Sequence, residues 1–591
     1  MNKFVSSLLG SFVGTWIAFM LFGAVIFISG IIMITSLSLS SIKTPPVNIS
    51  DNSVLYIDLN GVITERPVNR SFQEYINDSE PANNLHEILN AIELAKKDSR
   101  ISGIYLHNGA SSIGFATAKA IRDALQDFKQ STGKWIYAYG EVMDQKGYYV
   151  STIADSIYLN KVGALDIHGI VSTVPFYKGL LEKAGVEMQI IRVGTFKSAV
   201  EPYMLTSMSE ANRLQTQTYI NNLWNNICDS ISASRGIEKA TINEFADSLL
   251  MFSSPEVYVE KRFIDGLCYD HEFESIMKTQ LGIPEDEEIN YIDVHSFNTT
   301  KHDTKKSHNK IAVLYATGDI NVSGSKDGIN SDELVPEILE LAKDKDIKGL
   351  VLRVNSPGGS AYASEQIWEA LEQFKMTGKP FAVSMSDYAA SGGYYISCGA
   401  QRIFAEPTTI TGSIGIFAMI PNFGGLLSDK LGITTDFVST NKNSDISVVK
   451  ALTPAQTAAL QGSINRGYEL FSQRCAEGRN MDIAKLQSIA EGRVWDATEA
   501  KKIGLVDEYG NTSDAVKWVA QKAGISNNFM VTYLPEYKED FLNMLYAAMS
   551  DSYYETKLKE KYGIMYDYFN EINTLLQRDP IQCRMECLTL K

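Results

Sequence analysis

The stretch 387–395, Asp-Tyr-Ala-Ala-Ser-Gly-Gly-Tyr-Tyr, follows the apolar run 380–385 and precedes residues that can close a helical turn. This order predicts a buried strand, then a turn at Ser391, then a helix. Gly392 accepts backbone angles that a residue with a Cβ resists, so the amides after the serine can face the group that its hydroxyl attacks. Because glycine and serine dominate turns for conformational reasons, this stretch alone favours an ordinary turn.

A second glycine-rich stretch changes that balance. Residues 355–360, Asn-Ser-Pro-Gly-Gly-Ser, follow the apolar strand 347–354 and precede a helical pattern from Tyr362 to Lys375. Gly358 and Gly359 therefore lie at another strand end, where bare amides can face an oxyanion. Together the two stretches resemble the signal peptide peptidase A (protease IV) family, within the Clp protease/crotonase superfamily.

Composition limits the classes of protein that need to be considered. A chain of 591 residues is too long for one core and predicts at least two domains. Its apolar content of 45% is that of a globular protein. A net charge of -16 argues against nucleic acid as a partner. The six cysteines have the spacing of neither a zinc site nor a disulfide framework.

The amino-terminal region predicts a membrane anchor. No charged residue lies between Lys3 and Lys43, and the apolar stretch from Phe12 to Ile34 is long enough to span a bilayer. No convincing cleavage site follows it. We therefore expect a cytoplasmic segment over 1–11, an uncleaved transmembrane helix over 12–36 and a tether over 37–51. The charge bias favours the amino terminus inside the cell and the bulk of the chain outside.

Beyond the anchor the chain repeats itself. Segments 101–106, 132–137, 147–151 and 167–171 match segments 347–352, 377–382, 393–397 and 410–414, with an offset between 243 and 246 residues. Such a steady offset predicts two copies of one domain, over 52–298 and 311–525. The polar residues 299–310 then form a linker, and 526–591 form a carboxy-terminal extension with one or two helices between 537 and 577.

Each copy alternates apolar strands with amphipathic helices, which predicts an α/β fold with parallel strands and helical crossovers. The resemblance implies, more specifically, tandem duplicated Clp protease/crotonase-like domains of β-β-α superhelical design. In the second copy we expect strands at 311–317, 347–354, 380–385, 402–405, 410–416 and 433–438, and helices near 331–344, 362–376, 453–477 and 512–523.

The two copies differ in chemistry. Where the second copy has Ser391-Gly392-Gly393, the first has Gln145-Lys146-Gly147, so the first copy cannot act as an independent serine enzyme. The second copy has no histidine, because all seven histidines precede residue 311. Its base must therefore be another residue type, or come from the first copy.

A lysine can serve as the base if burial holds it neutral. Lys197 and Lys442 occupy equivalent positions of the repeat. Lys197 lies among apolar and small residues that can lower its pKa, whereas Lys442 lies in a polar run that would keep a cation solvated. Physical reasoning thus prefers Lys197, and Lys442 stays as the alternative.

The resemblance also implies catalytic roles for individual residues. Residues 194–202, Gly-Thr-Phe-Lys-Ser-Ala-Val-Glu-Pro, look like the motif of the base lysine in two-domain members, whereas single-domain members take serine and lysine from one domain. It implies Ser391 as nucleophile, the amides of Gly392 and of Gly358 or Gly359 as the oxyanion hole, and Ser413 as a hydroxyl that orients the lysine. Ser413 is equally well read as a plain turn residue.

The family's activity is the hydrolysis of signal peptides and other short apolar peptides, without a metal or cofactor. The resemblance further implies a homo-oligomer, a tetramer, in the bacterial inner membrane with periplasmic catalytic domains. Two other classes stay open: a crotonase-type acyl-CoA enzyme, which would turn the same amides toward a thioester, and a non-catalytic membrane scaffold. The membrane span and a serine placed as nucleophile argue against the first.

Overall fold

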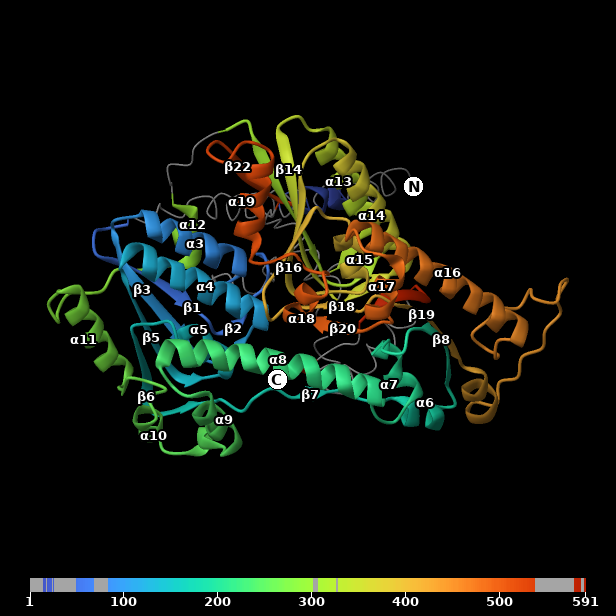
Figure 1. The fold of residues 1–591 in the computed structure, drawn as a ribbon, viewed down its shortest axis with the longest axis horizontal. Coiled ribbons are helices and arrows are strands. Elements are labelled where there is room, and N and C mark those ends of the chain that lie inside the picture. Colours follow the sequence, from blue (N-terminus) through green and yellow to red (C-terminus); the bar gives the residue numbers. More distant parts are fainter. Residues whose placement is uncertain are drawn as a thin grey trace, which may run out of the picture.

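The computed structural model of the chain describes residues 14–16, 19–23, 25, 49–67, 83–300, 307–325, 328–536, 579–585 and 589–590. Two α/β halves lie side by side in Figure 1, the first blue to green and the second yellow to red.

Six parallel strands form the sheet of the first copy. They are buried between layers and so consist of nearly continuous apolar runs, as in β1. Side by side they are β10 (Tyr291–Asp293), β1 (Ser53–Asp58), β3 (Ile101–Asn108), β5 (Trp135–Met143), β6 (Ser156–Leu165) and β9 (Gly266–Leu267).

The second copy has the same strand order. Its parallel strands are β22 (Met530–Leu534), β11 (Lys310–Thr317), β14 (Ile347–Ser356), β16 (Phe381–Ala390), β17 (Arg402–Ala405) and β21 (Glu508–Tyr509). The far end of β16 also pairs with β18 (Ile410–Gly412), which pairs antiparallel with β20 (Val494–Asp496). This common order confirms the predicted α/β fold and its duplication.

A third sheet contains strands from both copies. Its order is β13 (Ile329–Asn330), β12 (Ile320–Asn321), β15 (Gly358–Ser360), β23 (Ile581–Arg584), β19 (Ile416–Asn422) and β8 (Glu187–Val193). The strand β8 belongs to the first copy and pairs along its whole length with β19 of the second. Two short pairs complete the strands: β2 (Gly61–Val62) with β4 (Ser111–Ser112), and β7 (Ser172–Thr173) with β24 (Thr589–Leu590).

The 26-residue helix α8 (Glu210–Arg235) connects the copies along the lower side of Figure 1. Ser209 caps its first turn and Gly236 ends it in the left-handed conformation. Its side chains reach the second copy, where Gln215 Oε1 accepts from Val494 N at 3.0 Å and Asn222 Nδ2 donates to Asp496 Oδ2 at 2.8 Å.

The remaining helices are connectors and sheet-covering layers. In the first copy they are α3 (Leu85–Lys97), α4 (Phe115–Thr132), α5 (Gln145–Ser151), α6 (Lys178–Ala184), α7 (Glu201–Met204), α9 (Lys239–Asp247), α10 (Glu256–Glu260), α11 (Asp270–Leu281) and α12 (Val294–Thr299). In the second they are α13 (Ser331–Lys343), α14 (Ala361–Met376), α15 (Gly392–Cys398), α16 (Pro454–Gly478), α17 (Ile483–Ile489), α18 (Ala497–Lys502) and α19 (Thr512–Lys522).

A buried ion pair lies where the copies meet. Arg353 on β14 donates to both carboxylate oxygens of Glu65 at 2.9 and 3.1 Å, and both side chains are almost fully buried. Arg353 also donates to Ser384 Oγ, Met385 O and Ser386 Oγ. Because the guanidinium and the carboxylate satisfy each other, the charges are tolerated inside the molecule.

Most of the strands and helices expected for the second copy are confirmed, and the strands expected at 433–438, 380–385 and 410–416 need correction. The strand expected over 410–416 is interrupted, because β18 ends at Gly412 and β19 begins at Ile416. The segment 433–438 forms no strand: Val438 is fully exposed and the segment pairs with none of the described strands. The strand expected over 380–385 continues to Ala390. In the extension, the described residues form the strands β22, β23 and β24, and the helices expected between 537 and 577 lie outside the described residues.

Most of the anchor expected over 12–36 also lies outside the described residues. Among the helices that are described, none combines the length and apolarity needed to cross a bilayer.

Candidate active site

Ser391 lies at a strained turn between a strand and a helix. The strand β16 ends at Ala390, Ser391 has φ 56° and ψ −112°, and α15 begins at Gly392. A positive φ on a non-glycine residue costs about 1–3 kcal/mol and is typical of functional sites. The turn is held by Ser391 N, which donates to Gly412 O at 2.8 Å, and by Tyr395 N, which donates to Ser391 O at 2.8 Å.

Lys197 reaches the same point from the first copy. It follows β8, whose pairing with β19 carries the chain to the second copy. After β8, Gly194 has φ 104° and lies so close to Glu491 that a Cβ there would collide with the Glu491 backbone. Phe196 N donates to Glu491 O at 3.0 Å, which fixes the approach of the lysine.

The two side chains are in direct contact. Lys197 Nζ lies 2.7 Å from Ser391 Oγ, 3.0 Å from Ser413 O and 3.1 Å from Ser413 Oγ. A neutral amine has two N–H donors and one lone pair. When both N–H groups of the neutral amine are directed to Ser413, its lone pair can accept the Ser391 hydroxyl proton, so the neutral form can make all three contacts, as the ammonium form can with its three N–H groups.

Burial favours the neutral form. Lys197 is 1% exposed, and loss of solvation lowers the pKa of its amine to about 7. Among the residues that the structure describes, no carboxylate is close enough to contribute to this shift, whereas a neighbouring carboxylate would hold the proton on the amine. The base is therefore neutral in about half of the molecules at pH 7.

Ser413 has a constrained backbone of its own. Its φ is 51°, and its amide donates to Arg493 O at 2.6 Å. This conformation presents both the carbonyl and the hydroxyl of one residue to the lysine amine. These contacts are ones that a residue orienting the lysine would make.

The three glycines expected at the oxyanion hole lie together. A Cβ on Gly358, which has φ 104°, would come within 2.7 Å of Gly392 N, and one on Gly392 would come within 3.1 Å of Gly359 N. Their backbones therefore approach more closely than side chains would permit. The amide of Gly358 donates to Ser356 Oγ at 3.2 Å.

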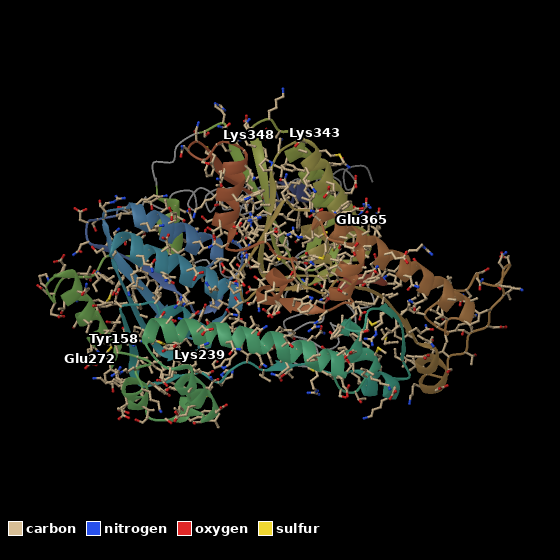
Figure 2. All side chains as sticks on the ribbon, in the orientation of Figure 1. Tyr158, Lys239, Glu272, Lys343, Lys348 and Glu365 are labelled. Carbon is tan, nitrogen blue, oxygen red and sulfur yellow. The ribbon has the colours of Figure 1, made fainter. Side chains whose placement is uncertain are left out.

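A second group of contacts holds the helix that follows the nucleophile. Tyr395 Oη donates to Glu365 Oε2 at 2.6 Å, and Arg474 Nη2 donates to Glu365 Oε1 at 2.8 Å. Glu365 on α14 thereby connects α15 to α16, and it is labelled in Figure 2 on the side facing α16. These bonds keep the turn at Ser391 in place.

Two residues that support Lys197 were not singled out by sequence reasoning. Glu201 is buried and accepts from Ser209 Oγ at 2.6 Å and from Asn212 Nδ2 at 3.2 Å, which ties α7 to α8. Gln215 Nε2 donates to Phe196 O at 3.2 Å and to Ser198 Oγ at 3.1 Å. Glu201 could have been found from the sequence, because it is a charged residue among the apolar and small residues that follow Lys197. Gln215 gives no such signal, because it is one of many polar residues on a long helix.

Asp387 is another residue whose contacts sequence reasoning did not predict. It lies inside β16 and accepts from Ala116 N at 2.8 Å, Thr117 N at 3.1 Å and Thr117 Oγ1 at 2.7 Å. It therefore caps α4 of the first copy, whose own cap residue Gly114 has no side chain. Because this cap compensates its burial, Asp387 lies within β16, beyond the end of the strand expected over 380–385.

The other candidate positions lie away from this chemistry. Lys442 is exposed to solvent. Gln145, at the position equivalent to the nucleophile, accepts from Gly169 N at 3.0 Å and donates to Gly169 O at 3.1 Å. The amide therefore holds the neighbouring loop of the first copy in place.

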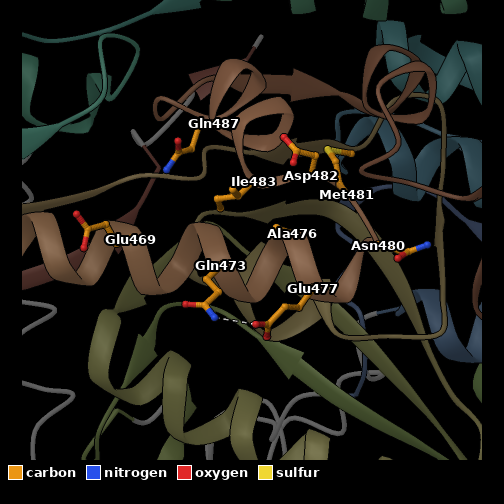
Figure 3. Close-up of a pocket in the computed structure, with 9 residues that line it drawn as sticks. All are labelled: Glu469, Gln473, Ala476, Glu477, Asn480, Met481, Asp482, Ile483 and Gln487. Carbon is orange, nitrogen blue, oxygen red and sulfur yellow. Dashed lines mark hydrogen bonds between the residues drawn. The ribbon is translucent and has the colours of Figure 1, made fainter.

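A groove of about 740 Å³ between α16 and α17 is also separate from the dyad (Figure 3). It is lined by side chains that are mostly polar and include Glu469, Glu477 and Asp482. In Figure 3 Gln473 donates to Glu477 at 2.8 Å across one turn of α16. Since none of the candidate site residues lines this groove, it is not the place of the chemistry.

A serine at a strained turn, touching a buried lysine beside the closely approaching backbones of Gly358 and Gly392, is the arrangement of a serine hydrolase with a lysine base. The model of peptidase family S49 matches residues 128–273 and 373–526, and that of Clp protease matches 302–410. The chain belongs to peptidase family S49 and is a serine peptidase of the protease IV type, which confirms the resemblance read from its two glycine-rich stretches.

Relatives match over most of the chain. Protease 4 of Salmonella typhi is 34% identical over 514 residues, which are 84% of this chain and 82% of the relative. Protease 4 of Haemophilus influenzae is 35% identical over 447 residues, 74% and 72% of the two chains. The chloroplastic serine protease SPPA of Arabidopsis thaliana is 30% identical over 448 residues, 74% and 65% of the two chains.

Proposed function

We propose that the chain is a membrane-anchored endopeptidase in which Ser391 is the nucleophile and Lys197 the general base. The observation that carries this proposal is the 2.7 Å contact between Lys197 Nζ and Ser391 Oγ, made by an amine whose pKa burial lowers to about 7. Each copy contributes one of the two groups.

The reaction follows from these contacts. Neutral Lys197 takes the proton of Ser391 while the serine oxygen attacks a peptide carbonyl. The amide of Gly392, with that of Gly358 or Gly359, holds the oxyanion. The lysinium then gives its proton to the leaving amine, and water hydrolyses the acyl-enzyme with Lys197 again acting as base. The residues named here need no metal or cofactor for these steps.

Short apolar peptides, cleaved signal peptides among them, are the proposed substrates. One relative, from Enterococcus faecium, is described as a putative signal peptide peptidase. An anchor over 12–36 would hold the site near peptides left in a bilayer, with the catalytic copies on the periplasmic side of a bacterial inner membrane. In support, described residues of this stretch expose large apolar side chains, with Trp16 at 61%, Phe19 at 75% and Phe22 at 66%. A homo-oligomer, a tetramer, completes the proposal.

Labelling and substitution test the assignment of the nucleophile. A serine-directed phosphonate is expected to label Ser391 in the parent chain, and the Ser391→Ala variant is expected to lose both label and peptidase activity while unfolding at the parent's temperature. Hydrolysis of a signal-peptide mimic by the Ala variant at near the parent rate would refute the assignment.

A further inference from the structure

A further cavity lies where the two copies meet, and none of the candidate catalytic residues lines it. Its volume is about 570 Å³, which is in the range of small-molecule sites. Helices α3 and α4 of the first copy form one wall, and the turn after β17 and the start of α19 in the second copy form the other; Figure 1 shows these helices next to one another. The residues that line this junction pocket include Ile92, Lys96, Lys119, Asp123, Glu406 and Asp514.

One carboxyl group at the wall of the junction pocket has no partner. Glu406 is 3% exposed, yet among the described residues no group donates a hydrogen bond to its Oε1. Lys119 is the cation that lowers its pKa most, but the ammonium group of Lys119 pairs with Asp123 on its own helix. Burial accordingly raises the pKa of Glu406 to about 7. Because a buried carboxyl group without a partner is costly, this one calls for a group from outside the chain.

The backbone around Glu406 holds the carboxyl group in this position. Glu406 N donates to Thr409 Oγ1 at 3.1 Å, and Thr409 N donates to Glu406 O at 2.9 Å. Thr409 Oγ1 donates in turn to Ser386 O on β16 at 2.7 Å. The turn is therefore fixed to the sheet of the second copy, and the carboxyl group stays at the wall of the junction pocket.

The lysines around the junction pocket already have acidic partners. Lys96 pairs with Glu93 at 3.0 Å, and Lys517 Nζ lies 3.6 Å from Asp514 Oδ1. The lining has five carboxyl groups against three ammonium groups, so carboxyl groups are in excess. Such a set of charges attracts a cation.

The lining favours an organic cation over a metal ion. In the part of the chain that the structure describes, no three carboxylate, imidazole or thiol groups are arranged as metal ligands, whereas Mg²⁺ and Ca²⁺ take about six or more oxygen ligands. Leu89, Ile92 and Ala124 add apolar surface to the first-copy wall, against which methylene groups can lie. Ammonium groups joined by methylene chains match both kinds of surface.

We propose that the junction pocket is a binding site for a linear aliphatic polyamine, one ammonium group of which binds the Glu406 carboxylate. Because the ligand contacts both copies, it stabilises their junction and with it the folded chain. The site shares no residue with the Ser391–Lys197 pair. The proposal thus goes beyond the proposed peptidase function, and Ser391→Ala is expected to bind the polyamine as the parent does.

Spermidine binding to the full chain tests the proposal by calorimetry and by melting temperature. Salt at about 0.15 M screens loose attraction to a chain of net charge -16. We expect saturable binding at one site and a melting temperature that rises with the spermidine concentration. Glu406→Gln keeps the shape of the side chain and removes its charge, so it is expected to weaken binding about tenfold or more. Absence of saturable binding by the parent, or equal affinities of the parent and Glu406→Gln, would overturn the proposal.

Asp496→Asn is the matched control. Asp496 is also a buried carboxyl group of the second copy whose pKa burial raises, but it accepts from Asn222 and lies outside the junction pocket. This variant is expected to keep the parent affinity for spermidine, and a tenfold loss in it would count against the proposal.

Ala124→Lys gives a second variant, which decides the question if Glu406→Gln does not fold. It puts an ammonium group on the wall of the junction pocket, where Ala124 lies on α4, and is expected to abolish spermidine binding. Mg²⁺ at equal charge is expected to leave the melting temperature of the parent unchanged. Parent-like binding by Ala124→Lys, or a rise with Mg²⁺ as large as with spermidine, would show that the attraction is not specific to this pocket and would overturn the proposal.

Discussion

The neutral lysine predicts a particular dependence of kcat/KM on pH. With an ordinary pKa of 10.5, about one lysine in three thousand would be neutral at pH 7, whereas a pKa of about 7 makes about half of them neutral. Desolvation thus raises the concentration of the active base about a thousandfold. We expect kcat/KM to rise about tenfold per pH unit below pH 7 and to level off above pH 8.

Lys197→Arg separates lysine from any other group that titrates near neutrality. This variant is needed because a histidine would also titrate at about 6.5. The guanidinium keeps its charge at every working pH, so kcat/KM is expected to fall by about 10²–10⁴ and to lose its rising limb. The assay is hydrolysis of a fluorogenic apolar peptide between pH 5 and 10. A parent limb near pH 10, or an Arg variant within tenfold of the parent rate, would refute the neutral-lysine mechanism.

Three further predictions follow from burial and packing. Between pH 7 and 10.5 the unfolded chain binds a proton at Lys197 that the folded chain does not, so the stability of the folded chain rises with pH in that window. Below pH 7 the full cost of burying the lysine amine remains. Lys197→Met is therefore expected to raise the free energy of unfolding in urea by roughly 4 kcal/mol at pH 7. Gly358→Ala places a Cβ against Gly392 and is expected to lower kcat about 10²-fold or more, whereas the control Gly378→Ala, at φ 80° with open space around it, should lose stability and keep kcat. Arg353→Met leaves Glu65 buried without its partner and should lower the free energy of unfolding by about 3–5 kcal/mol, most of which the double variant with Glu65→Leu is expected to regain.

The sequence predicts those parts of the site that depend on residues close together along the chain. A strand, a small hydroxyl residue and two glycines in a row locate the turn at Ser391, and the structure has that turn between β16 and α15. The apolar neighbours of Lys197 similarly indicate burial, and the amine is 1% exposed. The duplication is visible in the sequence because each strand of one copy repeats in the other.

What sequence reasoning missed depends on residues far apart along the chain. The strand expected over 380–385 leaves out Asp387, whose burial within β16 is costly unless it has hydrogen-bond partners; those partners lie at the start of α4, some 270 residues earlier. The segment Ile581–Arg584 is too short to be recognised as a strand, and its partners lie in β15 and β19. No periodicity within such a segment reveals that it pairs with two strands that are distant in the sequence.

The junction of the two copies joins stability to catalysis. Burial at the contact between the first copy and the second lowers the pKa of Lys197 to about 7, and the same junction is held by the pair Glu65–Arg353 and by Asp387 at the start of α4. If the copies separated, water would reach the amine, its pKa would return toward 10.5, and the base would become an ammonium ion at neutral pH. Ser391 would then lose its proton acceptor even with its own turn intact. In the proposed mechanism the copy without a serine at the nucleophile position is thus half of the site, because it supplies both the lysine and part of the burial that lowers the pKa of the lysine.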